Sequence, residues 1–289
     1  MLIAAGHHVV GLARSDQAAA ALTSAGAEVH RGALDHLDSL RSGAAAADGA
    51  IQTAFIHDFS QLAGAGRSDQ RAVETLGAAL EGSGRPLVIA SGIGLLTPGR
   101  VGTEEDSPDP GSPAAHRIAS EETAISLASR GVRSSVVRLP PSVHGEGDHG
   151  FVPALIDIAR TKGVSAHIGD GSSRWPAVHR LDAAHLFRLA LETAPAGSGL
   201  HGVADEGVPV RDIAEVIGRR LNVPVVSVSR EAAGEHFDWL AGFLALDVPA
   251  SSALTQERLG WQPTHPGLIA DLEAGHYFAA AGVSVLSSS

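Results

Sequence analysis

The sequence predicts an α/β fold that is doubly wound around a parallel β-sheet, with a smaller C-terminal domain. Three observations support this prediction. Short apolar stretches alternate with helix signals through the first half of the chain. These stretches are almost continuously apolar, which is typical of strands covered by helices on both faces of a sheet. The alternation becomes irregular after Gly145, so domains are expected at 1–145 and 146–289.

Each element of the first half has a local signal. The chain opens on "MLIAAGHHVVGLARSD", in which Gly6 ends a helical turn and an apolar strand follows. Ser15 or Asp16 caps an alanine-rich helix, and Ser68 or Asp69 caps a later helix that runs to Glu81. Strands are expected at 8–13, 27–31, 49–57, 85–94 and 131–145, and helices between them at 16–25, 34–48, 69–81 and 113–130.

The end of the first half has two proline signals. Ser112 followed by Pro113 marks the start of the helix at 113–130, since proline suits the first helical position. Pro140 and Pro141 stop the fifth strand. In the second half, helices are expected near 152–161, 182–193 and 211–221, with a strand near 199–204 that returns to the main sheet.

Composition restricts the class of protein. The 289 residues carry a formal net charge of −11, which argues against a broad surface for nucleic acid or anionic membrane. No apolar run approaches the roughly 20 residues that span a bilayer. Cysteine is absent, so disulfides and thiolate metal sites are excluded. We therefore expect a cytoplasmic protein whose partner is a small molecule.

A set of segments, in order along nearly the whole chain, resembles one family. The segments are "AAGHHVVGLARSD", "VHRGALDHLDSL", "LVIASGIG", "VRSSVVRLPPSVHGEG", "WPAVHRLDAAHLF" and "RLGWQPTH". Together they resemble the extended or atypical short-chain dehydrogenase/reductases, which include the NAD-dependent epimerase/dehydratase proteins. The resemblance implies a Rossmann-type dinucleotide-binding domain at 1–145 and a substrate domain at 146–289. It also implies a homodimer that pairs through the helices at 69–81 and 113–130.

The family pattern normally begins with a strand and a glycine-rich turn that approaches the cofactor pyrophosphate. The printed sequence begins at the far end of the helix that follows this turn. Two interpretations stay open at this point. A start codon placed too late is the favoured one. If the chain does start at Met1, the sheet lacks a central strand and tight cofactor binding is not expected.

The resemblance also predicts cofactor contacts. The second family strand ends in Arg14-Ser15 without a carboxylate, so Arg14 can pair with a 2′-phosphate and NADP is predicted in preference to NAD. Further contacts are expected from residues that follow the other strands. Leu34 and Asp35 would lie near the adenine, Ala54 and Phe55 near the ribose and pyrophosphate, and Pro140, Ser142 and Val143 near the nicotinamide.

The usual proton-transfer pair of the family, Tyr-x-x-x-Lys, cannot be present. The chain has one lysine, Lys162, and one tyrosine, Tyr277, 115 positions later. The resemblance places Arg117 where the lysine would be and Ser91 at the family serine. His116, beside Arg117, is a candidate proton carrier because an imidazole titrates near neutral pH. The catalytic candidates are therefore Ser91, Arg117 and His116.

Two segments are candidates for contact with substrate. "HGEGDHG" contributes His144, and "SSRWPAVHRLD" contributes Arg174, Trp175 and His179. One glycine-rich loop rarely supplies the geometry of a metal site, so no metal is expected. Asp182 is expected to cap its helix.

Three functions are consistent with these residues. The favoured one is an atypical NADP-dependent oxidoreductase that acts on a small carbonyl or hydroxyl compound. A non-catalytic NAD(P)-binding regulatory or redox-sensing protein is the first alternative. A nucleotide-sugar epimerase or dehydratase is the second.

Overall fold

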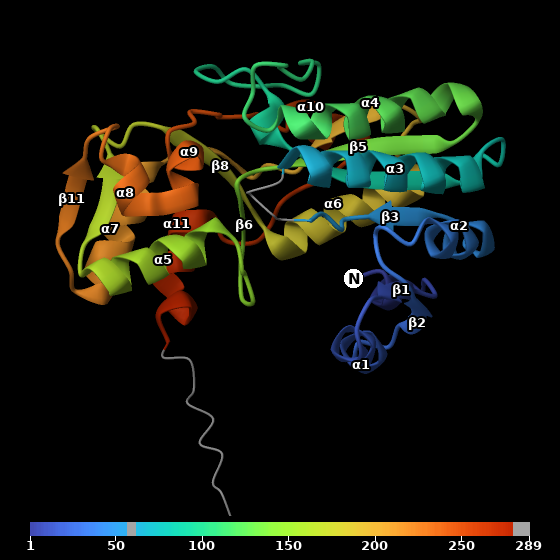
Figure 1. Ribbon diagram of the computed structural model, residues 1–289, viewed down its shortest axis with the longest axis horizontal. Helices are drawn as coiled ribbons and strands as arrows, with labels where there is room; N and C mark the ends of the chain where they lie inside the picture. The colour runs from blue at the N-terminus through green and yellow to red at the C-terminus, as the bar shows by residue number, and fades with distance from the viewer. Residues whose placement is uncertain (57–61, 280–289) are drawn as a thin grey trace, which may run out of the picture.

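A computed structural model describes residues 1–56 and 62–279 and confirms the α/β fold (Figure 1). The main sheet has the strand order β3-β4-β5-β9, and all its neighbours are parallel. Its strands are β3 (Ala50–Gln52), β4 (Pro86–Gly92), β5 (Arg133–Leu139) and β9 (Ser198–His201).

Helices cover both faces of this sheet, as the apolar strands require. Leu87, Ile89 and Val136 point to the face covered by α3 (Leu62–Leu80) and α4 (Ile118–Ser126). Val88 and Val137 alternate to the opposite face, where they pack under α6 (Arg180–Thr193). Because the strands are parallel, their carboxyl ends share one edge, where ligands bind in open α/β sheets.

The N-terminal strands form a separate two-stranded parallel sheet. It contains β1 (Val10–Ala13) and β2 (Glu28–Arg31), joined by α1 (Asp16–Ser24). Ahead of it lies the short 3-10 helix η1 (Ile3–Ala5), which ends at Gly6 with a φ of 91°. The helix α2 (Leu37–Ala46) then leads back to β3.

The sheet is divided between β1 and β3. Within residues 1–56 and 62–279, β1 pairs only with β2, and β3 pairs only with β4. Apolar side chains beside the division are exposed, including Val10 at 47% and Leu12 at 39%. Figure 1 shows β1, β2 and α1 as a small unit below the main sheet.

The C-terminal part is built on two further small sheets. One has the order β10-β8-β6, and the other pairs β11 with β7. Their strands are β6 (Ser142–His144), β7 (Ser165–Ile168), β8 (Arg174–His179), β10 (Asp205–Pro209) and β11 (Val225–Val228). The helices are α5 (Phe151–Lys162), α7 (Val210–Leu221), α8 (Ala233–Phe237), α9 (Ala241–Leu244), α10 (Ala253–Leu259) and α11 (Leu268–Ala274). The boundary at 145 stays a prediction.

Several expected boundaries are corrected. The helix expected from Ser68 or Asp69 begins at Leu62, and Asp69 is fully buried inside it, because apolar positions continue the helix upstream. The strand expected at 49–57 is β3 alone, and His57 lies outside the described residues. The helix expected at 113–130 is α4 flanked by two 3-10 turns, η3 (Ala115–Arg117) and η4 (Leu127–Arg130).

Other short elements complete the fold. They are the 3-10 turns η2 (Ile93–Leu95), η5 (Asp238–Leu240) and η6 (His276–Phe278). Among the described residues, no helix is long and apolar enough to cross a membrane.

Candidate functional site

A hollow of about 280 Å³ lies at the carboxyl ends of β1 and β2. Its walls are Ala13, Arg14, Arg31, Gly32, Ala33 and His36. Arg31 is brought beside the end of β1 because Ala13 and Arg31 are register partners in the parallel pair. Sequence reasoning found Arg14 but missed Arg31 and His36, although the strand register would have indicated Arg31.

Two cations give this hollow its charge. Arg14 is exposed, while Arg31 donates to the Asp16 carboxylate at 2.7 Å. Ser15 serves as the N-cap of α1, since its Oγ accepts from the backbone N–H of Ala18 at 3.2 Å. A phosphate bound here would meet two guanidinium groups.

The two residues predicted to contact the adenine, Leu34 and Asp35, lie in different environments. Leu34 packs on the core under α2 and α3, whereas Asp35 is exposed beside the wall residue His36. Ala54 lies just beyond β3, and its carbonyl accepts from Gln52 Nε2 at 2.7 Å.

Ser91 lies at the carboxyl end of β4 and points toward α4. Its hydroxyl donates to Glu121 Oε2 at 2.8 Å, and the serine is 8% exposed. Arg138 on β5 holds the other carboxylate oxygen, donating from Nε at 3.0 Å and also from Nη2. The donor of Ser91 is thus committed to Glu121, and only its lone pairs are available for another hydrogen bond.

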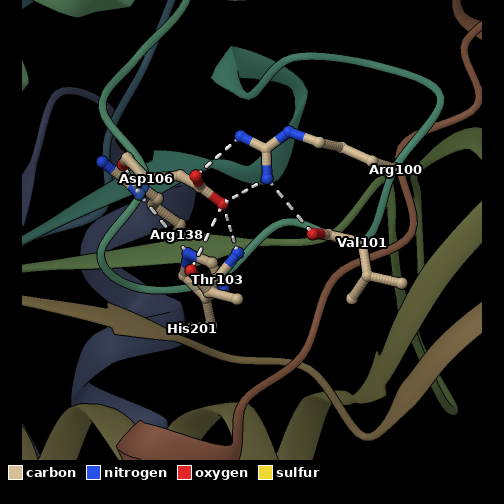
Figure 2. Close-up of polar contacts among 6 residues, drawn as sticks. All are labelled: Arg100, Val101, Thr103, Asp106, Arg138 and His201. Atoms are coloured by element: carbon tan, nitrogen blue, oxygen red, sulfur yellow. Dashed lines mark hydrogen bonds and ion pairs between the residues drawn. The ribbon is translucent and has the colours of Figure 1, made fainter.

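Arg138 also links Ser91 to the surface. Its Nη1 donates to the Asp106 carbonyl at 2.9 Å and lies 3.4 Å from His201 Nε2 (Figure 2). Arg100 pairs with the Asp106 carboxylate at 2.6 Å and lowers the pKa of Asp106 to about 2. Burial lowers the pKa of His201 and favours a neutral ring beside Arg138. This network could not be predicted from short sequence patterns, since its members are far apart along the chain.

Arg117 and His116 come together with Phe55 near the carboxyl end of β4. Arg117 Nε lies 3.2 Å from the buried Asp69 carboxylate, and its Nη2 donates to the Ala90 carbonyl at 2.5 Å. Its guanidinium stacks 4.2 Å from the Phe55 ring, with the His116 ring 5.7 Å from the same ring. Burial lowers the pKa of Arg117, and burial together with Arg117 lowers the pKa of His116.

The residues expected near the nicotinamide lie in two places, one at the end of β5 in the main sheet and two in the C-terminal sheet. Pro140 is buried directly after β5. Ser142 and Val143 lie in β6, which pairs with β8 in the C-terminal sheet. Pro140 and Pro141 lack the N–H that would continue the ladder of β5, which explains the change of sheet.

His144 and His179 are buried and form a histidine cluster with the exposed His265. His144 Nδ1 lies 2.9 Å from Asp271 Oδ2, and the His144 and His179 rings are 5.5 Å apart. The His179 ring stacks on His265 at 4.6 Å. His144 is fully buried, so this cluster joins the C-terminal segment to the end of β6.

Asp182 supports the cluster in a different way from the one expected. His179, not Asp182, caps α6, with its Nδ1 accepting from the Leu181 N–H at 3.2 Å. The Asp182 carboxylate instead accepts from the backbone N–H of Thr264 and His265 and pairs with the His265 ring at 2.8 Å.

Arg174 and Trp175 are adjacent on β8 and point in opposite directions. Arg174 makes a two-pronged ion pair with Asp247, at 2.8 Å from Nε and from Nη2. Trp175 is fully buried, and its Nε1 donates to the Phe243 carbonyl at 3.1 Å.

The lone lysine and tyrosine lie in the C-terminal part. Lys162 Nζ donates to the Glu235 carbonyl. The Tyr277 hydroxyl donates to Asp148 at 2.9 Å and accepts from the Gly145 N–H, and burial raises the pKa of Tyr277. Neither side chain adjoins Ser91 in these contacts. Among the described residues, no group of three or more His, Cys, Asp or Glu could hold a metal ion.

The chain has close relatives in two yeasts. It is 52% identical over 279 residues to the uncharacterized protein C2A9.02 of Schizosaccharomyces pombe, covering 96% of this chain and 94% of the relative. It is 44% identical over 277 residues to the uncharacterized protein YLL056C of Saccharomyces cerevisiae, covering 95% and 93%. A more distant relative is a 4-hydroxy-2-methyl-3-oxo-4-farnesyl-3,4-dihydroquinoline-1-oxide ketoreductase of Stigmatella aurantiaca, 29% identical over 204 residues and covering 68% of this chain and 60% of the relative. No family model matches the chain.

Solved structures identify the fold. The dTDP-glucose 4,6-dehydratase DesIV of Streptomyces venezuelae, solved with NAD, matches with a TM-score of 0.75 at 18% identity, covering 94% of this chain and 90% of DesIV. The UDP-glucose 4-epimerase of Thermotoga maritima matches with a TM-score of 0.73 at 17% identity, covering 96% and 92%. The chain therefore has the fold of these NAD-dependent dehydratase and epimerase structures.

At the carboxyl ends of its strands the chain has groups that fit part of a nicotinamide dinucleotide. The hollow with Arg14 and Arg31 suits an adenosine that carries a phosphate, because guanidinium groups bind phosphate in a two-pronged geometry. Ser91, Arg117 and His116 lie at the ends of β4 and η3, on the carboxyl edge of the main sheet. A glycine-rich phosphate turn is not part of the printed sequence.

Proposed function

We propose that the chain is an NADP-dependent oxidoreductase of atypical short-chain dehydrogenase/reductase type, acting on a small carbonyl or hydroxyl compound. The observation that carries this proposal is the hollow at the ends of β1 and β2 with Arg14 and Arg31 in its walls. The residues that line the hollow include two arginines and no carboxylate, although Asp16 pairs with Arg31 beside it, and this lining favours the 2′-phosphate of NADP over the free hydroxyl of NAD. The distant ketoreductase relative supports carbonyl reduction.

The cofactor, when bound, supplies or accepts a hydride at the substrate carbon. Arg117 is proposed to hold a ribose hydroxyl, since Asp69, Phe55 and the Ala90 carbonyl fix its guanidinium at the sheet edge. Ser91 is proposed to accept a hydrogen bond from the substrate hydroxyl through its lone pairs, because its own O–H donates to Glu121.

The proton is proposed to pass through His116. Burial and Arg117 lower the pKa of His116, so its ring is neutral near pH 7 and can accept the proton of a substrate hydroxyl during oxidation. In the reverse direction the same ring would return this proton to the carbonyl oxygen of the substrate. In each turnover, one hydride and one proton in total are removed from the hydroxyl compound or added to the carbonyl compound.

The remaining cofactor and substrate assignments are also proposals. Ser15, Asp35, Ala54 and Pro140, which follow strands of the two N-terminal sheets, and Ser142 and Val143 of β6 would contact the cofactor. On the C-terminal side, His144, Arg174 and His179 would hold the loops beside the substrate in place through their own ion pairs and ring contacts. We also propose a cytoplasmic homodimer that pairs through α3 and α4, which sedimentation of the purified protein would test.

A non-catalytic NADP-binding sensor is the second candidate. It is favoured by the positions of Lys162 and Tyr277, which are engaged in the C-terminal part. The nucleotide-sugar alternative is supported by the fold of DesIV and the epimerase, at low identity. Turnover distinguishes these candidates, because the sensor binds the cofactor without consuming it.

The test combines binding and turnover. Purified protein is titrated with NADPH and NADH, and loss of NADPH absorbance is followed with a panel of aldehydes and ketones. Tighter binding of NADPH, weakened at least about tenfold in Arg14→Ala and Arg31→Ala, would support the cofactor assignment. The matched control is Arg230→Ala, an exposed arginine of the C-terminal part, which should leave binding unchanged. Equal binding of both cofactors by all variants would contradict the assignment.

A further inference from the structure

His36 is a third basic side chain in the wall of the hollow at the ends of β1 and β2. The other two are Arg14, directly after β1, and Arg31, the last residue of β2. None of the six residues of this wall is a carboxylate, although the chain carries a formal net charge of −11. The hollow therefore gathers basic groups in a chain that is acidic overall, which suits an anionic ligand.

Two backbone hydrogen bonds bring His36 back to the ends of the strands. Gly32 N–H donates to the Ala13 carbonyl at 3.2 Å, which continues the pairing of β1 and β2 by one residue. His36 N–H donates to the Ala33 carbonyl at 3.0 Å and closes a tight turn before α2. A Cβ on Gly32 would overlap Ser39 Oγ, so glycine allows α2 to begin this close to the strands.

The His36 ring takes no part in holding the fold. His36 is the N-cap of α2, yet its side chain makes no capping hydrogen bond. Its ring is exposed, and among the described residues neither this ring nor the Arg14 side chain forms a hydrogen bond or an ion pair. Of the three basic side chains, Arg31 alone has a partner, the exposed Asp16 carboxylate at 2.7 Å. The N-cap position favours Ser, Thr, Asp or Asn, so a histidine with an unused ring at this place indicates contact with a ligand.

The charge of this ring depends on pH. Imidazole is the side chain that ordinarily gains its proton between about pH 5 and 8, whereas carboxylates and guanidinium groups keep their charge there. The charged and titratable groups of the surrounding elements are Arg14 after β1, Asp16 of α1, His30 and Arg31 of β2, Asp35 of the turn, and Asp38 and Arg41 of α2. His30 does not line the hollow, since its Nε2 lies 2.9 Å from the Ser39 carbonyl. His36 is therefore the wall residue whose charge changes in this range.

We propose that protonated His36 is the third ligand of the adenosine 2′-phosphate, so that the affinity for NADP falls as the pH rises through neutrality. This inference rests on the proposed function and adds the residue that makes cofactor choice depend on pH. The phosphate would meet two guanidinium groups and one imidazolium, and charge-assisted hydrogen bonds of this kind are the stronger ones. The ribose of NAD carries a neutral hydroxyl instead, so the preference for NADP should be greatest on the acid side of neutrality.

The test is isothermal titration calorimetry of the full chain with 2′,5′-ADP and with 5′-AMP, at about pH 6.5 and about pH 8.5. A phosphate monoester loses its last proton near about pH 6, so its own titration would strengthen binding as the pH rises. The parent chain should nevertheless bind 2′,5′-ADP about tenfold more tightly at the lower pH, because the imidazolium is lost at the higher one. Binding of 5′-AMP should change little.

Three variants identify the ring that causes this change. His36→Asn should bind 2′,5′-ADP about tenfold more weakly than the parent at the lower pH and equally at the higher one, and asparagine suits the N-cap of α2. His36→Lys keeps its positive charge at both pH values and should bind tightly at both. The matched control is His8→Asn, at a histidine that pairs with Glu28 at the opposite, amino ends of β1 and β2. It should keep the pH dependence of the parent.

The outcomes separate the role of His36 from the proposed function. If 2′,5′-ADP binding requires Arg14 and Arg31 but has the same pH profile in His36→Asn and the parent, the role of His36 is overturned while the oxidoreductase function stands. If binding depends on His36 as predicted but NADPH is consumed with no carbonyl compound, the phosphate site stands and the proposed function fails. If 2′,5′-ADP binds no more tightly than 5′-AMP at the lower pH, the hollow is not a 2′-phosphate site and the inference is overturned.

Discussion

Replacement of Glu121 by glutamine tests the buried network behind Ser91. The side chains of Glu121 and Arg138 are each only 5% exposed, so the pair is almost completely removed from solvent. Arg138 gives two donors to one carboxylate oxygen, and Ser91 gives its proton to the other. Glu121→Gln keeps the shape but removes the charge that compensates the guanidinium.

The structure allows the magnitude to be estimated. Removing one partner of a buried ion pair typically costs about 3–5 kcal/mol, because the other charge is left uncompensated. For 289 residues the entropy of unfolding is about 0.6 kcal/mol per degree, so the melting temperature should fall by about 5–8 °C. Reorientation of the Ser91 hydroxyl should also reduce kcat in the proposed reaction, while the cofactor affinity is retained.

The assay is urea denaturation and thermal melting of the two proteins, with a matched surface pair as control. Arg130 contacts Glu81 with two donors, as Arg138 contacts Glu121, but these side chains are 43% and 48% exposed. Glu81→Gln should change stability little, since exposed pairs are screened by solvent. Equal losses in Glu121→Gln and Glu81→Gln would refute the reasoning from burial.

Three further predictions follow from other contacts. His179→Asn should flatten the loss of stability that sets in below about pH 6.5. Burial and His265 lower the pKa of His179, so its contribution is complete above about pH 6.5 and is lost as the pH falls through its folded pKa. Urea titrations at several pH values check this, with the exposed His8→Asn keeping the parent slope. Asp182→Ala should cost about 3 kcal/mol by the same assay, because two backbone N–H groups lose their acceptor; a loss no larger than that of His8→Asn would contradict it. Adding a strand and glycine-rich turn before Met1 should tighten NADPH binding if such a strand fills the division between β1 and β3; unchanged affinity would count against this placement.

Much of the fold could be predicted because its signals are local. Gly6 in the left-handed region, the Ser15 cap and the near-continuous apolar run of β4 each depend on a few consecutive residues. These signals indicate the alternation of strands and helices without reference to distant contacts. The start of α3 was misplaced because Asp69 has the composition of a cap, while in the structure it is a buried partner of Gln52 and Arg117.

The site could be predicted only in part because its chemistry is not local. Arg14 and Ser91 follow strands that the apolar pattern identifies, so their place at the sheet edge could be inferred. The Glu121–Arg138 pair joins a helix to a strand 17 positions later, and His265 reaches Asp182 across 83 positions. Such contacts depend on tertiary packing, which one sequence does not encode in any short pattern.

The most direct test of the central claim is a crystal structure of the protein with NADPH. We expect density for the adenosine 2′-phosphate in the hollow between Arg14 and Arg31, and for the nicotinamide at the carboxyl end of β4 near Arg117. A dinucleotide bound elsewhere, or one whose phosphate contacts neither arginine, would contradict the account.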